Sequence, residues 1–268
     1  MMNTHAKQAS RGDTIRRFNR YELKYILPAE RSQAVIRDLR SMVEPDDHGG
    51  EAGYRITSLY YDSPDLDCFW AKIEGIKFRR KLRLRIYPGE DITKVDSGMV
   101  EIKQRVNRTV QKKRLKLPLP DAEALCRGED LSLELDDLDR VAASEVHYLI
   151  NALHLQPTCV ISYWRKAFVG GFYDAGLRVT FDADLRSRVH ELTVNADAPN
   201  HLWAPPDWCI MEVKANDSIP DWVTSLLARH NCQLHRVSKY CAGLAAARGI
   251  HAVPYTFPIG LTQERKHG

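Results

Sequence analysis

The segment from Lys77 to Arg85 places six cations in nine residues, in the two-residue rhythm of a β-strand. Side chains alternate between the two faces of a strand, so the cations at odd positions share one face. Leu82, Leu84 and Ile86 share the other face, which predicts packing on a core. Such a strand is either solvated on its charged side or built to hold a polyanion. The remaining strands decide between these two interpretations.

Composition limits the class of protein. The 268 residues are 44% hydrophobic and 28% charged, which is ordinary for a globular chain able to bury a large core. The net charge is only +4, so the cations matter where they cluster. Every apolar run is shorter than the about 18 residues that a membrane helix needs. The six cysteines are scattered without a Cys-x-x-Cys pair, which indicates reduced thiols in a cytoplasmic protein.

Alternating segments predict eight or nine strands, with helices between and after them. These segments follow one another without an internal repeat or a dividing linker, so we expect a single α+β domain with an antiparallel sheet that can close into a barrel. Three stretches have the apolar spacing of amphipathic helices. They are residues 29–42, 138–153 and 219–230.

Three predicted strands carry Glu-x-Lys, with both charges on one face. The pairs are Glu22 with Lys24, Glu101 with Lys103, and Glu212 with Lys214. For any one strand, a solvated outer face is the simpler interpretation. However, six strands share a charged face, and the amphipathic helices need an apolar sheet face to cover. We therefore expect the charged faces to line the inside of the sheet and the apolar faces to lie beneath the helices.

An interior of guanidinium and ammonium groups suits a chain of phosphates. Like charges at an effective dielectric constant of about 20 repel by several kcal/mol per close pair, so a purely cationic tunnel is unstable when empty. Arginine grips phosphate oxygens through two parallel hydrogen bonds, and nearby carboxylates can hold a bridging divalent ion. The chain lacks a Gly-x-x-x-x-Gly-Lys loop and a Gly-x-Gly-x-x-Gly fingerprint. Phosphate binding by a P-loop or a Rossmann turn is therefore excluded.

Eight ordered segments of the chain resemble the VTC domain, the catalytic domain of the vacuolar transporter chaperone polyphosphate polymerase. This domain is a branch of the CYTH-like triphosphate tunnel metalloenzymes. The segments are RYELKY (20–25), SLYYDSPDLDCF (58–69), KLRLRIY (81–87), VEIKQR (100–105), YWRKAF (163–168), LRVTFDADL (177–185), CIMEVKAN (209–216) and HRVSKYCAGL (235–244).

The resemblance implies an eight-stranded antiparallel β-barrel tunnel with surrounding helices, which binds triphosphate or polyphosphate with Mn²⁺ or Mg²⁺. On this basis, residues 15–250 form the tunnel domain. Residues 1–14 are expected to be a disordered N-terminal lead, because they are polar and lack the apolar region of a signal peptide. Residues 251–268 are expected to be a C-terminal tail.

The resemblance also implies roles for individual residues. The expected catalytic phosphate ligands are Lys24, Arg83, Arg85, Lys103, Lys112, Arg165, Arg178 and Lys239. Tyr163 and Ser238 are expected to bind substrate, and Glu212 is the expected metal ligand. Lys214 and Arg114 for substrate, and Glu22 for metal, join the set because they share faces with these residues. The register around Lys112 stays open, since Lys113 is adjacent.

Together these residues predict a polyphosphate polymerase that transfers the γ-phosphoryl group of ATP onto a polyphosphate chain. Arg20 stands where the hydrolases and cyclases of the superfamily carry the first carboxylate of Glu-x-Glu-x-Lys, which favours the VTC branch. A tripolyphosphatase or nucleoside triphosphatase, and a non-catalytic polyphosphate sensor, remain as alternatives.

The expected partners are ATP, polyphosphate and a membrane protein, without a membrane span in this chain. Sequence-independent binding of nucleic acid is disfavoured. Proteins that bind single strands interleave exposed aromatic side chains with their cations as stacking platforms. The basic run from Lys77 to Arg85 has only Phe78, on the opposite face of the strand.

Overall fold

The computed structural model describes residues 20–107 and 109–251. The lead predicted for residues 1–14 lies outside the described residues, as does the predicted tail after His251. The elements follow in the order β1 (Arg20–Pro28), α1 (Ala29–Leu39), β2 (Val43–Pro45), β3 (Tyr54–Asp62), α2 (Asp67–Ile73), β4 (Phe78–Ile86), β5 (Ser97–Val106), β6 (Thr109–Pro118), α3 (Leu119–Cys126), α4 (Asp137–Leu153), β7 (Gln156–Gly170), β8 (Arg178–Arg188), β9 (His201–Leu202), β10 (Trp208–Asn216), α5 (Asp221–Arg229) and α6 (Lys239–Arg248).

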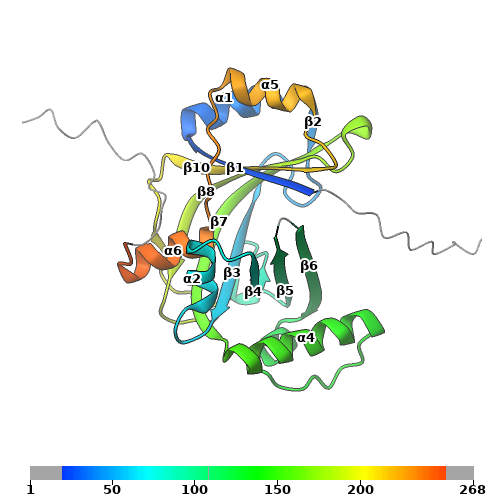
Figure 1. Ribbon diagram of the computed structural model, residues 1–268, viewed down its shortest axis with the longest axis vertical. Helices are drawn as coiled ribbons and strands as arrows, with labels where there is room; N and C mark the ends of the chain where they lie inside the picture. Colours follow the sequence, from blue (N-terminus) through cyan, green and yellow to red (C-terminus); the bar gives the residue numbers. More distant parts are fainter. Residues whose placement is uncertain (1–19, 108, 252–268) are drawn as a thin grey trace, which may run out of the picture.

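One antiparallel sheet organises the molecule. Its main path runs β1-β10-β8-β7-β3-β4-β5-β6, while β2 pairs with β7 and β9 pairs with β8. The sheet curves strongly, so that β5 and β6 come to face β1 and β10 across its concave side (Figure 1). The α+β class and the antiparallel sheet of the prediction are confirmed.

The predicted closure into a barrel is wrong, because the sheet is open between β1 and β6. Within the described residues, these two edge strands share no ladder. The free edge of β1 is instead used by the segment that leads to α6: the amide of His235 donates to the carbonyl of Lys24 at 2.7 Å, and Leu234 forms a bridge with Tyr25. An edge whose main-chain groups already have partners cannot extend the ladder. Lysines along β6 protect the other edge.

Helices cover the convex, apolar face of the sheet on two sides. Helices α1 and α5 lie over β1, β10 and β8, where Val35, Leu39 and Leu226 pack against Met211 and Val213 (Figure 1). Helices α3 and α4 cover β4, β5 and β6, and their apolar side chains pack against the even-numbered residues of β4. The predicted amphipathic helices are therefore confirmed, and they cover the faces that the charge pattern left apolar.

Helices α2 and α6 pack differently, against the concave side at one end of the sheet. Tyr240 of α6 stacks on Tyr60 of β3 with ring centroids 4.9 Å apart, and Leu244 joins a buried cluster with Ile161 and Ile210. The concave face is thus apolar where α6 fills it and charged along the remainder. In the described part of the chain, none of the helices has both the length and the apolar character to cross a bilayer.

Asp62 joins three of these elements at the filled end. Its carboxylate is fully buried at the end of β3 and accepts from the amides of Cys68 and Phe69 at 2.8 and 2.9 Å, which caps α2. The hydroxyl of Tyr240 donates to the same carboxylate at 2.5 Å. Since Tyr240 directly follows Lys239, this bond fixes where α6 begins and therefore where Lys239 lies.

We predict that Asp62→Asn lowers the free energy of unfolding by about 1–3 kcal/mol, because an amide cannot accept all of these hydrogen bonds with one oxygen. Urea unfolding measures the loss. The matched control is Asp65→Asn in the same loop, where the side chain is exposed and a change within about 0.5 kcal/mol is expected. Equal effects of the two substitutions would show that Asp62 does not hold α6.

Candidate functional site

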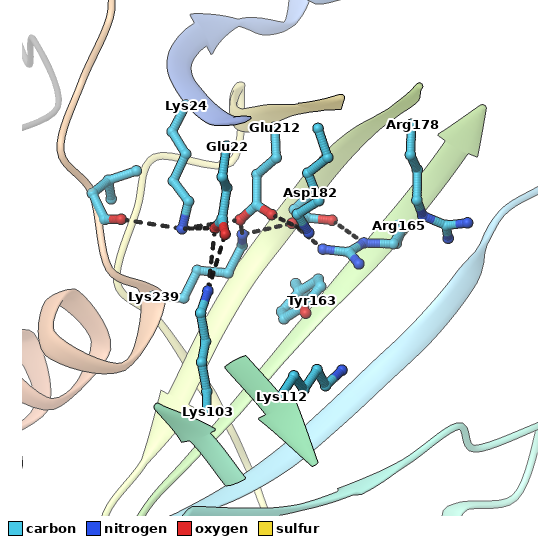
Figure 2. A network of polar contacts seen from close by, with 12 residues as sticks. Glu22, Lys24, Lys103, Lys112, Tyr163, Arg165, Arg178, Asp182, Glu212 and Lys239 are labelled. Carbon is cyan, nitrogen blue, oxygen red and sulfur yellow. Dashed lines mark hydrogen bonds and ion pairs between the residues drawn. The ribbon is translucent and has the colours of Figure 1, made fainter. Parts of the chain in front are cut away.

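The charged face of the sheet lines a cavity of about 2760 Å³. All fourteen residues assigned from the sequence lie in its wall. Figure 2 shows Glu22, Lys24, Lys103, Glu212 and Lys239 pointing toward one another. Their roles in binding phosphate or metal stay predictions. Their convergence follows from strand register, because alternate residues of neighbouring strands face the same side.

Glu212 is the centre of one charged cluster. Glu212 is 5% exposed, and its carboxylate forms ion pairs with the ammonium groups of Lys239 at 2.6 Å, Lys214 at 3.0 Å and Lys24 at 3.4 Å. Lys24 lies directly opposite Glu212 in the ladder between β1 and β10. Burial alone raises the pKa of Glu212, but Lys239, Lys24 and Lys214 together hold it well below its usual range. Glu212 is therefore an anion that keeps three lysines inside the cavity wall.

Asp182 extends this cluster along β8, and the sequence analysis did not assign it to the site. Its fully buried carboxylate accepts two hydrogen bonds from Arg165, at 2.6 and 2.7 Å, and one ion pair from Lys239 at 2.6 Å (Figure 2). Arg165 and Asp182 are direct partners in the ladder between β7 and β8. The signal was present, since Asp182 shares the strand face of Arg178.

Glu101 forms the centre of a second cluster on the other side of the cavity, and it too was not assigned. Glu101 is 1% exposed, and its carboxylate forms ion pairs with Arg83 at 2.5 Å, with Arg114 at 2.9 Å and with Lys112. Arg85 lies 3.9 Å from the same carboxylate. Burial raises the pKa of Glu101, but Arg83, Arg85 and Lys112 together hold it well below its usual range. The Glu-x-Lys pattern of β5 contained this signal.

The register around Lys112 is now settled. Lys112 faces the cavity, whereas Lys113 points to the convex side and pairs with Glu145 of α4 at 2.5 Å. Burial lowers the pKa of Lys112 to about 7, although Glu101 raises it. Arg83 also lowers it, because a second positive charge beside the ammonium disfavours protonation. Lys112 is thus a cation whose charge depends on pH near neutrality.

Glu22 and Lys103 connect the edge strand β1 with β5, the strand beside the other edge. Lys103 of β5 reaches Glu22 of β1 at 3.0 Å, and Lys24 approaches the same carboxylate at 3.2 Å (Figure 2). Burial raises the pKa of Glu22, but Lys24 and Lys103 lower it below its usual range. A side-chain ion pair therefore joins β1 to β5 across the concave side of the sheet, where no main-chain ladder links the two strands.

Tyr163 lies between the two clusters. Its hydroxyl accepts from Arg85 at 3.2 Å, while Arg165 and Lys239 approach its ring at 5.3 and 5.1 Å from the centroid. A ring face attracts cations, so Tyr163 helps to hold Arg165 and Lys239 beside their carboxylate partners.

A divalent metal fits this donor set only with help from a ligand. In the described ranges, no group of three or more His, Cys, Asp and Glu side chains is arranged to hold a metal ion. The ammonium of Lys24 nevertheless contacts both carboxylates, that of Glu22 at 3.2 Å and that of Glu212 at 3.4 Å. Mg²⁺ is usually held by one or two carboxylates, with water and substrate phosphates as the remaining ligands. The pair therefore fits an ion that arrives with phosphate.

Comparison with known proteins matches the chain to a family model and to curated relatives. The family model of the VTC domain matches residues 19–248. Subunit 4 of the vacuolar transporter chaperone complex of Schizosaccharomyces pombe is 26% identical over 296 residues. That alignment covers 92% of this chain and 40% of the relative, so the chain spans less than half the length of the curated relative.

Solved structures similar to the chain include two from bacteria. One is a proposed adenylate cyclase from Bacillus halodurans, with a TM-score of 0.45, 13% identity, and coverage of 81% of this chain and 92% of that chain. The other is a proposed adenylate cyclase from Vibrio parahaemolyticus, with a TM-score of 0.41, 10% identity, and coverage of 83% and 96%.

We predict that Glu101→Gln destabilises the free protein by about 3 kcal/mol, because Arg83, Arg114 and Lys112 lose their buried counter-ion. Polyphosphate should restore much of that stability, since its phosphates neutralise the same cations. Urea unfolding with and without polyphosphate measures both effects. Glu145→Gln, which frees Lys113 on the outer side, is the control and should change stability by less than about 1 kcal/mol. A stabilisation by polyphosphate that is no larger in Glu101→Gln than in the wild type would contradict this account.

We also predict that binding of polyphosphate takes up a proton at pH 8. Lys112 is mostly neutral above its pKa of about 7 in the free protein, and adjacent phosphate favours the ammonium form. Affinity should therefore fall as pH rises from about 7 to about 9. Calorimetry in buffers of different ionisation enthalpy measures the proton uptake. The Lys112→Arg variant stays charged throughout, so an undiminished uptake in that variant would show that another group titrates.

Proposed function

The chain belongs to the VTC domain family, and from this premise we propose that it is a polyphosphate polymerase. It transfers the γ-phosphoryl group of ATP to the terminal phosphate of a polyphosphate chain: the terminal oxygen forms a bond to the γ-phosphorus, the bond between β- and γ-phosphate breaks, and ADP leaves. Polyphosphate is both acceptor and product.

The observation that carries this proposal is the charge of the cavity wall. Among the residues that the structure describes, eighteen lysines and arginines line the cavity, against eight aspartates and glutamates. The three phosphates of one nucleotide neutralise only part of this excess. A wall that stays cationic beyond the length of a triphosphate supports a chain of phosphates as the second ligand.

The arrangement suits a reaction that depends on position and charge more than on a nucleophilic side chain. The acceptor is already an anionic oxygen, so the reaction needs no strong general base. Arg165, Arg83 and Lys239 are each held by a buried carboxylate and are preorganised before the ligand arrives. Donors fixed in advance at a developing charge lower the barrier, because they need not reorganise during the reaction. Two anionic chains also repel each other, and the cationic wall offsets that repulsion.

We further propose that Glu212, together with Glu22, holds Mn²⁺ or Mg²⁺ that enters with the phosphates. When bound, such an ion supplies positive charge to the phosphate oxygens. Lys24, which contacts both carboxylates, then becomes available to a phosphate oxygen. The remaining residues of this cluster keep the carboxylates in place.

The cellular setting is also part of the proposal. The curated relative is a subunit of a vacuolar transporter chaperone complex and is much longer than this chain, which supports a membrane-protein partner for this domain. All six cysteines are free, five of them buried, which supports a reducing cytoplasmic location.

We predict that short polyphosphate primes the reaction. The purified protein is incubated with ATP labelled in the γ-phosphate and with Mn²⁺, and the products are separated by gel electrophoresis. Label should appear in long chains, and added primer should shorten any lag in the release of ADP, because the acceptor is the chain end. If the label appears as free phosphate at a rate that primer does not change, the protein is a triphosphatase. If ATP is not consumed while polyphosphate still binds, the protein is a sensor.

The Glu212→Gln variant tests the metal assignment. The substitution is nearly isosteric but removes the charge that the metal requires, so turnover should fall by at least about tenfold at saturating Mn²⁺. Glu145→Gln on the outer side should leave turnover unchanged. Equal turnover of Glu212→Gln and wild type at saturating Mn²⁺ would show that Glu212 does not hold the ion.

A further inference from the structure

Three aromatic rings lie together at one end of the cavity. The ring of His48 packs edge-on against Tyr54, with centroids 4.4 Å apart, and against Tyr87, with centroids 4.7 Å apart. Tyr54 and Tyr87 are themselves 6.0 Å apart. All three rings line the cavity wall. None of them was assigned to the site from the sequence.

This aromatic cluster, formed by His48, Tyr54 and Tyr87, lies at the end of the cavity away from α6. Tyr54 begins β3, whereas Tyr60, near the end of the same strand, stacks on Tyr240 of α6. Strand β3 therefore runs from the aromatic end to the end filled by α6. The cluster is also incompletely buried: His48 is exposed, and Tyr54 and Tyr87 are partly buried. Rings that serve only as core are buried more fully.

The cluster is directly connected to phosphate-binding candidates. The hydroxyl of Tyr54 accepts from Arg178 at 3.2 Å, and both groups contact the carboxylate of Asp46, at 3.2 and 2.6 Å. Tyr54 is also the ladder partner of Arg165. On the other side, Arg85 precedes Tyr87 by two residues. Arg178, Arg165 and Arg85 therefore lie directly beside the aromatic cluster.

A ligand with a planar base at one end and several phosphates at the other matches an aromatic cluster with arginines beside it. We propose that the aromatic cluster binds the base of the nucleoside triphosphate, while the triphosphate extends inward toward Arg85, Arg165 and Arg178. Aromatic side chains bind bases through their faces, a contact that every base can make. The inference rests on the proposed function, because it assumes that the phosphoryl donor is a nucleotide.

This assignment fixes the orientation of the nucleotide in the cavity. The donor enters at the aromatic end with its base held at the mouth, and its γ-phosphate points away from that mouth. A base retained at the cluster also distinguishes a nucleotide from inorganic tripolyphosphate, which offers the cavity the same kind of phosphates without a base. The aromatic cluster therefore determines which donor is selected, and the inner cations bind both.

Tyr87→Ala tests the proposal through two ligands. Binding of a non-hydrolysable ATP analogue and of inorganic tripolyphosphate is measured by calorimetry. Loss of the stacking contact should raise the Kd of the analogue about tenfold, while the Kd of tripolyphosphate should change less than twofold. Tyr87→Phe keeps the ring and should bind both ligands as the wild type does. Tyr148→Ala, an exposed tyrosine on the outer side, is the control for the loss of an aromatic residue.

The outcomes separate this inference from the proposed function. Retained tripolyphosphate binding shows that the Tyr87→Ala variant is folded; if it is not folded, His48→Ala replaces it, because His48 is exposed, and the same selective loss is expected. If both ligands weaken equally, or neither does, the aromatic cluster does not bind the base, whatever the protein's activity. If the wild type binds tripolyphosphate but not the ATP analogue, the nucleotide donor is wrong and the inference is wrong with it. A selective loss in a protein that makes no polyphosphate would support the base site and refute the polymerase.

Discussion

Burial of carboxylates among cations is the interaction on which the remaining structure depends. Glu101, Glu212 and Asp182 are almost completely buried, and each receives two or more cations. Without them, the concave face would repel itself and could not stay folded around a cavity. These carboxylates use only part of the hydrogen-bonding capacity of each arginine and lysine, so the cations remain able to bind phosphate oxygens. The cost of burying so many charges is offset by the apolar convex face and its covering helices.

Much of this arrangement could be predicted from local sequence. A period of two places Arg83 and Arg85 on one side of β4 and Leu82 and Leu84 on the other, and the same logic holds for the Glu-x-Lys strands. The amphipathic helices then decide which side is the interior. For that reason the whole set of fourteen residues assigned to the site lies in one cavity wall, even though it comes from seven strands and the start of α6.

What could not be predicted depends on contacts between distant segments. The sheet stays open because the segment of Leu234 and His235 occupies the edge of β1, and no local pattern reveals that partner. The strand pattern places Asp182 and Glu101 on the charged face, but only their ladder partners show that they are the buried counter-ions. The aromatic cluster joins a loop residue, His48, to the first residue of β3 and to the residue that follows β4, so its members have no common signature in the sequence.

The dependence of polyphosphate affinity on salt, measured for chains of increasing length, tests the central claim most directly. Each phosphate neutralised by the wall releases counter-ions, and log K falls with log salt by about 0.7 per phosphate if the value for single-stranded nucleic acid applies. A cationic interior predicts that the slope steepens as the chain grows beyond three phosphates, and that it becomes constant once the cavity is filled. A slope that is already constant at three phosphates, or that stays near zero, would contradict an interior built to hold a chain of phosphates.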